Sequence, residues 1–227
     1  MRVEVETIGR GRLLHVRDGE GRLPAPWIRA FNGLFAAWMW PAFRTARVST
    51  LELPASSNRP RVYYSWHAYS WVAHLIIAAI RSDERPAAIA HSGVASQLNQ
   101  RAGAFLGSEM LVFDVDSEMS PRAQIAEAMR VHGCDVMIFA DSGGPYFVLK
   151  PGMLHIAREV GAELVPFVIE SRPALRFGKT MRHLVPVPLA RLRMVAGPPI
   201  DSASASLDAC TAALEALEAS AFVRERP

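Results

Sequence analysis

Cysteine is scarce in this chain of 227 residues, and no long apolar run is present. Two cysteines, Cys134 and Cys210, are too few for a disulfide framework or a zinc site, and we expect each to be a buried thiol. No apolar run reaches the roughly 20 residues that a membrane-spanning helix needs. The mean hydropathy is only +0.12. The sequence therefore excludes a polytopic membrane protein and leaves a membrane-surface protein open.

Charge is distributed unevenly along the chain. Residues 1–61 hold ten Arg and five acidic residues, a net charge of +5, whereas residues 62–227 hold 15 basic and 17 acidic residues, a net charge of −2. A basic front half predicts an anionic partner, either lipid headgroups or nucleic acid. The first residues carry charges where a signal peptide needs an apolar core, so we expect the protein on the cytoplasmic side.

An aromatic stretch over residues 23–43 is the most unusual part of the front half. Its large apolar residues recur at helical spacing and predict an amphipathic aromatic helix; they are Trp27, Phe31, Leu34, Phe35 and Trp38. Nearby arginines suit a helix at a membrane interface, and a helix that covers the core is the alternative. Residues 1–22 predict an edge hairpin. We expect two parts, the hairpin and interface helix over 1–45 and an α/β domain over 46–227.

From residue 46 onward, expected strands alternate with expected helices. The strands are expected over 46–53, 60–66, 86–90, 110–115, 135–140, 163–169 and 192–196, and the helices over 69–80, 94–106, 121–132, 151–160 and 202–220. This alternation predicts an α/β fold with a mainly parallel central sheet flanked by helices. Pro166 lies inside a strand run, which predicts a bulge or an edge position there.

Polar residues that follow the expected strands are the candidates for a site, because sites in open α/β sheets gather at the carboxyl ends of strands. They are His67, His91, Asp114, Asp116, Asp141 and Glu170. His67 is the most informative, since it lies at the N-terminus of an apolar helix. Both the helix-end potential and an apolar setting favour a neutral imidazole, which can act as a general base. A capping or core histidine is the alternative.

The loop Asp141-Ser142-Gly143-Gly144 follows a buried strand. Such a loop is flexible and dense in backbone N–H donors, so it can hold an anion or a polar headgroup. An ordinary turn of the same composition is the alternative.

The run from Ala140 to Ser171 resembles the third and fourth motif blocks of the lysophospholipid acyltransferase superfamily. The similar branch is a bacterial one, long catalogued as a domain of unknown function. The matching groups are Asp141 in the loop, Gly144-Pro145, Lys150-Pro151-Gly152, Ala157-Arg158, Gly161-Ala162 and Val165-Pro166-Phe167. Upstream, Ser65-Trp66-His67 resembles the Trp-His block of that branch, in which the histidine is the catalytic base. The resemblance covers residues 60–200.

The resemblance implies a glycerolipid-acyltransferase-like fold and a transfer of a fatty acyl group. The donor would be acyl-CoA or an acyl-carrier protein as co-substrate, and the acceptor a hydroxyl of a lysophospholipid-like molecule. His67 would be the base and Asp141 the supporting acid or loop anchor. Substrate-binding roles would fall to Ser142, Gly143, Gly144, Lys150 and Pro166. The resemblance implies no metal and no bound cofactor. Its partners would be a lipid substrate and a peripheral membrane surface, and no nucleic acid.

The chain departs from the family pattern at several positions. The wider superfamily has Asp five residues after the histidine, where this chain has Val72. Two positions at which the branch has arginine, the residue that grips phosphate bidentately, are also changed. A catalytically silent relative that binds lipid or a protein partner is therefore the alternative.

A second alternative comes from the run Met110 to Ser117. An apolar strand followed by Asp114-Val115-Asp116 resembles the opening motif of haloacid-dehalogenase-type phosphohydrolases, which need magnesium. Lys150 could supply the lysine of such a site, but no acidic pair follows a later strand.

Overall fold

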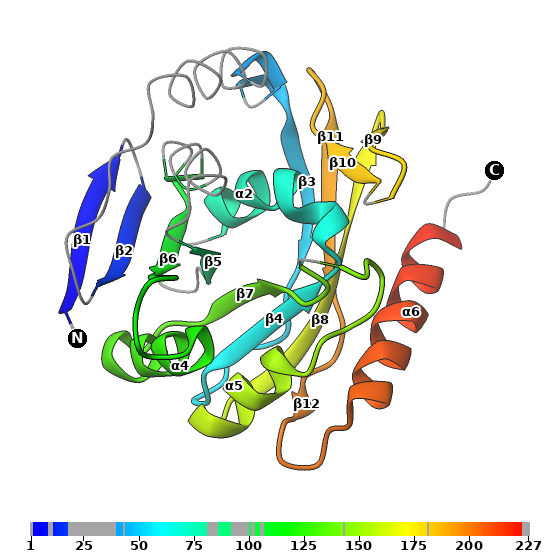
Figure 1. Ribbon diagram of the computed structural model, residues 1–227. Helices are drawn as coiled ribbons and strands as arrows, with labels where there is room; N and C mark the ends of the chain where they lie inside the picture. Colours follow the sequence, from blue (N-terminus) through cyan, green and yellow to red (C-terminus); the bar gives the residue numbers. More distant parts are fainter. Residues whose placement is uncertain are drawn as a thin grey trace.

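The computed structural model describes residues 2–8, 11–17, 40–42, 44–80, 86–91, 100, 103–104, 107–142, 144–180 and 182–223. Within them a twisted sheet of ten strands forms the centre of the molecule (Figure 1). Its strands are β1 (Arg2–Ile8), β2 (Gly11–Arg17), β3 (Arg47–Glu52), β4 (Arg61–Ser65), β5 (Ala87–His91), β6 (Glu109–Phe113), β7 (Val136–Phe139), β8 (Glu163–Arg172), β11 (Arg191–Ala196) and β12 (Ile200–Asp201).

The strand order is β1-β2-β6-β5-β7-β4-β8-β11-β3, with β12 paired to β8 beside β11. Six neighbouring pairs are parallel, namely β2 with β6, β6 with β5, β5 with β7, β7 with β4, β4 with β8, and β11 with β3. The pairs β1 with β2, β8 with β11 and β8 with β12 are antiparallel. The expected α/β fold with a mainly parallel sheet is therefore confirmed.

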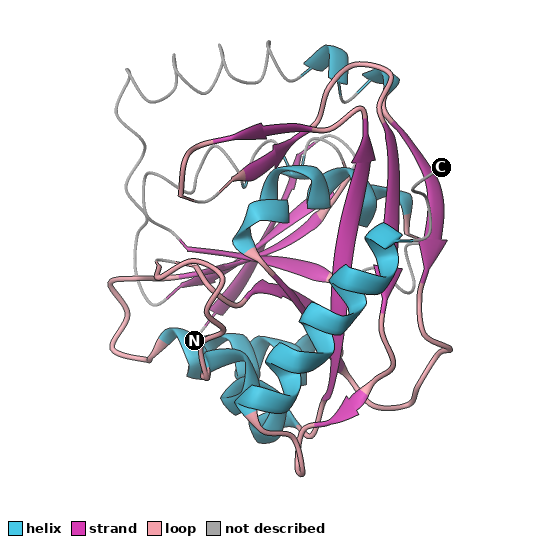
Figure 2. Ribbon diagram, turned by 90° about the vertical axis from the view of Figure 1, so that its right-hand side faces the viewer, coloured by secondary structure: helices cyan, strands magenta, loops and turns pink. Residues whose placement is uncertain are grey.

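Helices flank this sheet (Figure 2). They are the 3-10 turn η1 (His67–Tyr69), α2 (Ser70–Ala79), α4 (Pro121–His132), α5 (Gly152–Val160) and α6 (Leu207–Val223). The start of α4 follows from local chemistry, because Ser120 accepts a hydrogen bond from the N–H of Ala123 and Pro121 occupies the first turn. Its end at Gly133 has a left-handed backbone with φ 59°, which glycine adopts without strain.

The core lies around β4 and β8. All five residues of β4 are buried, as expected for a strand covered on both faces of a parallel sheet. Tyr64 is fully buried, and its hydroxyl donates to the carbonyl of Cys210 on α6 at 3.0 Å, so the polar group of that ring is paired.

Pro166 is not at an edge, because β8 lies between β4 and β11. β11 pairs with β8 as far as Phe167, and β12 pairs with β8 at Leu164. Pro166 therefore falls where the antiparallel neighbour changes, and its carbonyl accepts from the N–H of Gly197 at 2.8 Å. A Cβ at Gly197 would lie 2.9 Å from the Pro166 ring, so only glycine fits this approach.

Several expected elements differ from the structure or lie outside it. The hairpin of residues 1–22 is present, and its strand β2 joins the main sheet through β6. The aromatic helix over 23–43 lies outside the described residues except near its end, and most of the helix over 94–106 does too. The expected two-part division at residue 45 stays a prediction. The sequence patterns do not predict a separate hairpin, which is formed by β9 (Leu175–Phe177) and β10 (His183–Val185). The last helix begins at Leu207 rather than at 202.

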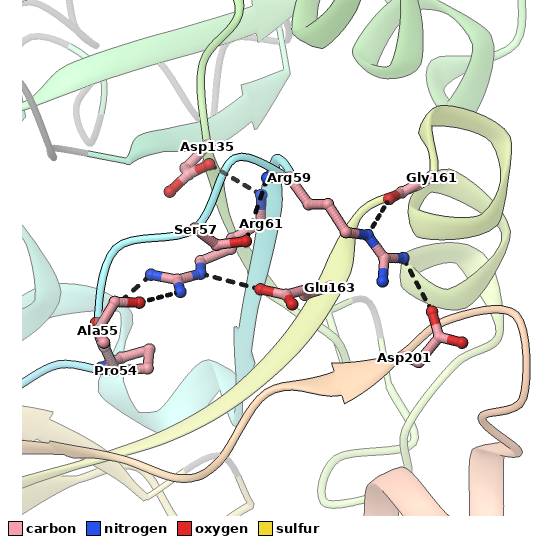
Figure 3. A network of polar contacts seen from close by, with 9 residues as sticks. All are labelled: Pro54, Ala55, Ser57, Arg59, Arg61, Asp135, Gly161, Glu163 and Asp201. Atoms are coloured by element: carbon pink, nitrogen blue, oxygen red, sulfur yellow. Dashed lines mark hydrogen bonds and ion pairs between the residues drawn. The ribbon is translucent and has the colours of Figure 1, made fainter.

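An arginine network ties the amino ends of the central strands together (Figure 3). Arg61 is buried, pairs with Glu163 at 3.3 Å, and donates to the carbonyls of Pro54 and Ala55. The backbone N–H of Arg61 donates to Asp135 at 2.8 Å. Arg59 lies nearby but on the exposed side, where it pairs with Asp201 at 2.8 Å.

The two arginines predict a contrast in stability. Replacing Arg61 with Ala leaves the half-buried carboxylate of Glu163 and the carbonyls of Pro54 and Ala55 without their partner. We therefore expect a loss of about 3 kcal/mol in the free energy of unfolding. Replacing Arg59 with Ala removes an exposed ion pair and should cause little measurable change. Chemical denaturation of both variants checks the contrast, and equal losses would contradict it.

Candidate active site

The candidate site forms where β4 and β7 end side by side. The two strands are parallel, with Ser65 opposite Phe139, so the residues that follow them leave the sheet at the same edge. The N–H of Ala140 donates to the carbonyl of Ser65 at 2.9 Å, which continues the pairing into the loops. His67 begins η1 after β4, and Asp141 is the second residue of the loop after β7. The structure thus brings together the two residues that the sequence singled out.

The carboxylate of Asp141 binds the backbone around it, and neither of its two hydrogen bonds goes to the imidazole. Its side chain is only 1% exposed. One carboxylate oxygen accepts from the backbone N–H of His67 at 2.5 Å, and the other accepts from the backbone N–H of Phe147 at 2.8 Å. Phe147 has a left-handed backbone with φ 62°, a strained state for a residue with a side chain. Asp141 is therefore the anchor of both loops.

Ser142 contacts the imidazole directly. Its hydroxyl oxygen lies 2.9 Å from Nδ1 of His67. The carbonyl of Ser142 accepts from the ammonium of Lys150 at 2.5 Å, and the N–H of Lys150 donates to the carbonyl of Ala140 at 2.9 Å. Lys150 therefore closes the loop that presents Ser142 to the histidine.

The surroundings of His67 favour its neutral form. Burial lowers the pKa of His67 below its ordinary value of 6.5, and the negative charge of Asp141 opposes that shift in part. Aromatic rings supply the apolar walls: Phe139 lies edge-on at 5.8 Å between ring centroids. A neutral imidazole at neutral pH can accept a proton.

His183 is a site residue that the sequence reasoning missed. It lies on β10, is 6% exposed, and packs edge-on against His67 with 5.2 Å between ring centroids. It also stacks on Trp71 at 4.8 Å. Nδ1 of His183 is buried with no hydrogen-bond partner among the described residues. Burial, followed by the nearby His67, lowers the pKa of His183 to about 4, so the ring stays neutral.

The remaining sequence candidates lie elsewhere or have other contacts. Gly143 lies outside the described residues, and Gly144, with φ 66°, continues the loop that Asp141 anchors. Pro166 is inside the sheet, opposite Tyr64 of β4. His91 ends β5, and burial lowers its pKa. Glu170 pairs with Arg172 at 3.0 Å.

Asp114 and Asp116 form a turn. The carboxylate of Asp114 accepts from the N–H of Asp116 at 3.0 Å, and the side chain of Gln124 bonds both the N–H and the carbonyl of Asp114. No group of three or more His, Cys, Asp or Glu side chains that could hold a metal occurs among the described residues. This geometry gives Asp114 a structural role.

Comparisons with known proteins give a weak likeness. No family model and no curated protein matches the chain. Among solved structures, the crystal structure of the 1-acyl-sn-glycerophosphate acyltransferase PlsC from Thermotoga maritima is similar, with a TM-score of 0.48 and 15% sequence identity. The match covers 88% of this chain and 80% of that chain. A likeness of this strength assigns no function to the chain.

Replacing Asp141 predicts a loss of stability. In Asp141→Ala, two backbone N–H groups lose their charged acceptor, and we expect the free energy of unfolding to fall by about 3 kcal/mol. Asp141→Asn keeps one amide oxygen and should lose less. Asp116→Ala, an exposed aspartate in a turn, is the control. Denaturant titrations give the values, and a loss no larger than that of the control would refute the anchor role.

The two histidines predict a pH dependence of stability. Both have a lowered pKa in the folded protein, so the unfolded chain binds more protons below the ordinary pKa of 6.5. Stability should therefore be lost as the pH falls from about 6.5 towards 4. His183→Phe keeps an aromatic ring and removes one titrating group, so its stability should change less steeply over this range. Melting temperatures of wild type and His183→Phe measured against pH provide the comparison, and identical slopes in the two proteins would contradict it.

Proposed function

We propose that the protein is an acyltransferase that moves a fatty acyl group from a thioester to a hydroxyl of a lysophospholipid-like acceptor, with His67 as the base. The observation that carries the proposal is the contact between Nδ1 of His67 and the hydroxyl of Ser142 at 2.9 Å. When Nδ1 holds its proton and donates to Ser142, the lone pair is on Nε2, to which no described residue is hydrogen-bonded. The sequence block Ala140–Ser171, which resembles acyltransferase motifs, supports the same conclusion.

The chemistry follows from this tautomer. Nε2 of His67 takes the proton of the acceptor hydroxyl as its oxygen attacks the thioester carbonyl carbon. The carbon–sulfur bond then breaks, and the leaving thiolate takes the proton from the imidazolium, which restores neutral His67. The carboxylate of Asp141 is close enough to favour the imidazolium electrostatically, as its effect on the pKa of His67 indicates. No proton is gained or lost over the cycle.

Ser142 fills a gap in the family pattern. Val72 is fully buried on α2 and cannot orient the imidazole as an aspartate at that position would. Ser142 can hold Nδ1 instead, from the loop after β7. Gly143, Gly144 and Lys150 complete the proposed substrate loop, in which the ammonium of Lys150 adds a positive charge for an anionic acceptor.

The donor and the location belong to the same proposal. Acyl-CoA or an acyl-carrier protein would serve as co-substrate, and the protein would act at the cytoplasmic face of a membrane as a peripheral protein, or in the cytoplasm. None of the helices in the described part of the chain combines the length and apolar character that crossing a bilayer requires.

A second candidate function uses the same contact with the opposite tautomer. If the hydroxyl of Ser142 donates to Nδ1 of His67, Ser142 becomes a nucleophile and His67 its base. The serine oxygen would then take the acyl group, the thiol would leave with the proton from His67, and water would release the fatty acid. The protein would be a thioester hydrolase with an acyl-serine intermediate.

One kinetic experiment separates these functions. Release of free thiol from a long-chain acyl-CoA is followed with and without a panel of lysophospholipids. Under the proposed function His67→Ala lowers kcat by about 100-fold or more, and thiol release needs an acceptor. Ser142→Ala should retain measurable turnover because Ser142 only orients the ring. The acid limb of its profile of activity against pH should shift. Wild-type activity should fall as the pH drops through the pKa of His67, which burial lowers below its ordinary value of 6.5. His155→Ala, an exposed histidine on α5, is the control.

Other results have distinct meanings. Thiol release without an acceptor, loss of all turnover in Ser142→Ala, and an acyl adduct on Ser142 in the mass spectrum would establish the hydrolase instead. Absence of turnover with every acceptor and with water would favour the catalytically silent relative.

A further inference from the structure

Two segments without acidic residues meet at the end of the sheet where the candidate site lies. The chain has no Asp or Glu between residues 21 and 51, or between 171 and 200. The N–H of Arg47 donates to the carbonyl of Ala190 at 2.8 Å, and the N–H of Leu189 donates to the hydroxyl of Thr45 at 2.8 Å. The first residues of β3 and β11 are paired, and the β9–β10 hairpin follows the end of β8, whose Arg172 is in register with Arg191, in the upper part of Figure 1.

Three arginines occupy neighbouring register positions on adjacent strands at this edge. Arg191 is the register partner of Arg47 on one side and of Arg172 on the other. Residues in register present their side chains on the same face, and like charges placed so are destabilising. Arg172 is balanced by Glu170 at 3.0 Å. No side-chain hydrogen bond or ion pair joins Arg47 or Arg191 to another residue of the described ranges, and both are exposed.

Large apolar side chains are exposed on the chain segments that adjoin the three arginines. Leu189 is 76% exposed, Phe177 66%, Leu175 48% and Trp40 42%. Leucine side chains gain nothing from a polar partner and gain free energy only when they leave water. The combination of free arginines with exposed leucine and aromatic side chains is typical of a surface that meets both anionic headgroups and acyl chains.

The same edge lies next to His67. Phe177 on β9 is the register partner of His183 on β10, and His183 packs against His67. A partner that covers Phe177 would therefore lie next to the candidate active site.

We propose that this edge, the docking edge, binds the surface of a bilayer that contains anionic lipids. The docking edge comprises Trp40, Leu175, Phe177 and Leu189 with the free arginines Arg47 and Arg191. The choice of a bilayer rests in part on the proposed function, which needs a lipid acceptor beside His67. A nucleic acid is the other polyanion that such arginines could bind, and the exposed leucines argue against it.

Sedimentation with vesicles tests the docking edge in the full chain, and no reaction is involved. Wild type should bind vesicles of phosphatidylcholine with phosphatidylglycerol more tightly than vesicles of phosphatidylcholine alone, and added salt should weaken binding. Each arginine near an anionic surface is worth about fivefold in partitioning, so R47Q/R191Q should bind roughly 25-fold more weakly. R47K/R191K keeps the charge and should bind like wild type. Phe177→Ser with Leu189→Ser should lower partitioning by at least about tenfold, since two large apolar side chains no longer insert.

The controls use exposed residues away from the docking edge. Val131→Ser and Arg122→Gln, both on α4, should leave partitioning unchanged, and circular dichroism confirms that each variant is folded. The proposal is overturned if wild type does not bind anionic vesicles, if either docking-edge variant partitions within twofold of wild type, or if single-stranded DNA competes fully for the same surface. A protein that binds vesicles as expected but never turns over a thioester would refute the proposed function and leave the docking edge standing.

Discussion

The geometry of the candidate site depends on one buried carboxylate. Asp141 accepts from the peptide N–H of His67 and from that of Phe147, and so joins the segments that leave β4 and β7. Charge-assisted bonds of this kind are short and strong, and they act on the backbone, so the imidazole is placed by the main chain and needs only Ser142 to set its rotation. The register of two parallel strands thus determines where the proposed base lies.

Much of this arrangement follows from sequence patterns that have a local cause. The β-branched and aromatic residues of β4 predict a strand, and α4 is bounded by Ser120, Pro121 and Gly133. The rule that sites lie past the carboxyl ends of strands places His67 and Asp141 among six candidates, and the resemblance to acyltransferase motifs selects these two. Their proximity follows from the pairing of β4 with β7, which the sequence does not predict.

Other features depend on contacts that no local pattern encodes. β9 and β10 are three residues each, too short for an alternating pattern, and the hairpin lies where it does because His183 and Phe177 stack on Trp71 of α2. For that reason, sequence patterns do not single out His183. The same hairpin carries a buried histidine against the site and an exposed phenylalanine beyond it, so one short element borders both the imidazole and the solvent. The sequence predicts a bulge or an edge position at Pro166; β8 is not an edge strand, and the change of partner from β11 to β12 at Pro166 has no signal in the strand itself.

The attachment of the amino-terminal hairpin to β6 has a consequence for the order in which the protein is made. Arg12 on β2 bonds Glu109 on β6, a partner 97 positions later in the chain. The ribosome therefore synthesises β1 and β2 long before β6, the strand that pairs with β2. Contacts between residues so distant in sequence form slowly. In the interval β2 is an unpaired strand edge, open to association with other nascent chains, and a chaperone that shields such edges would raise the yield of the native sheet.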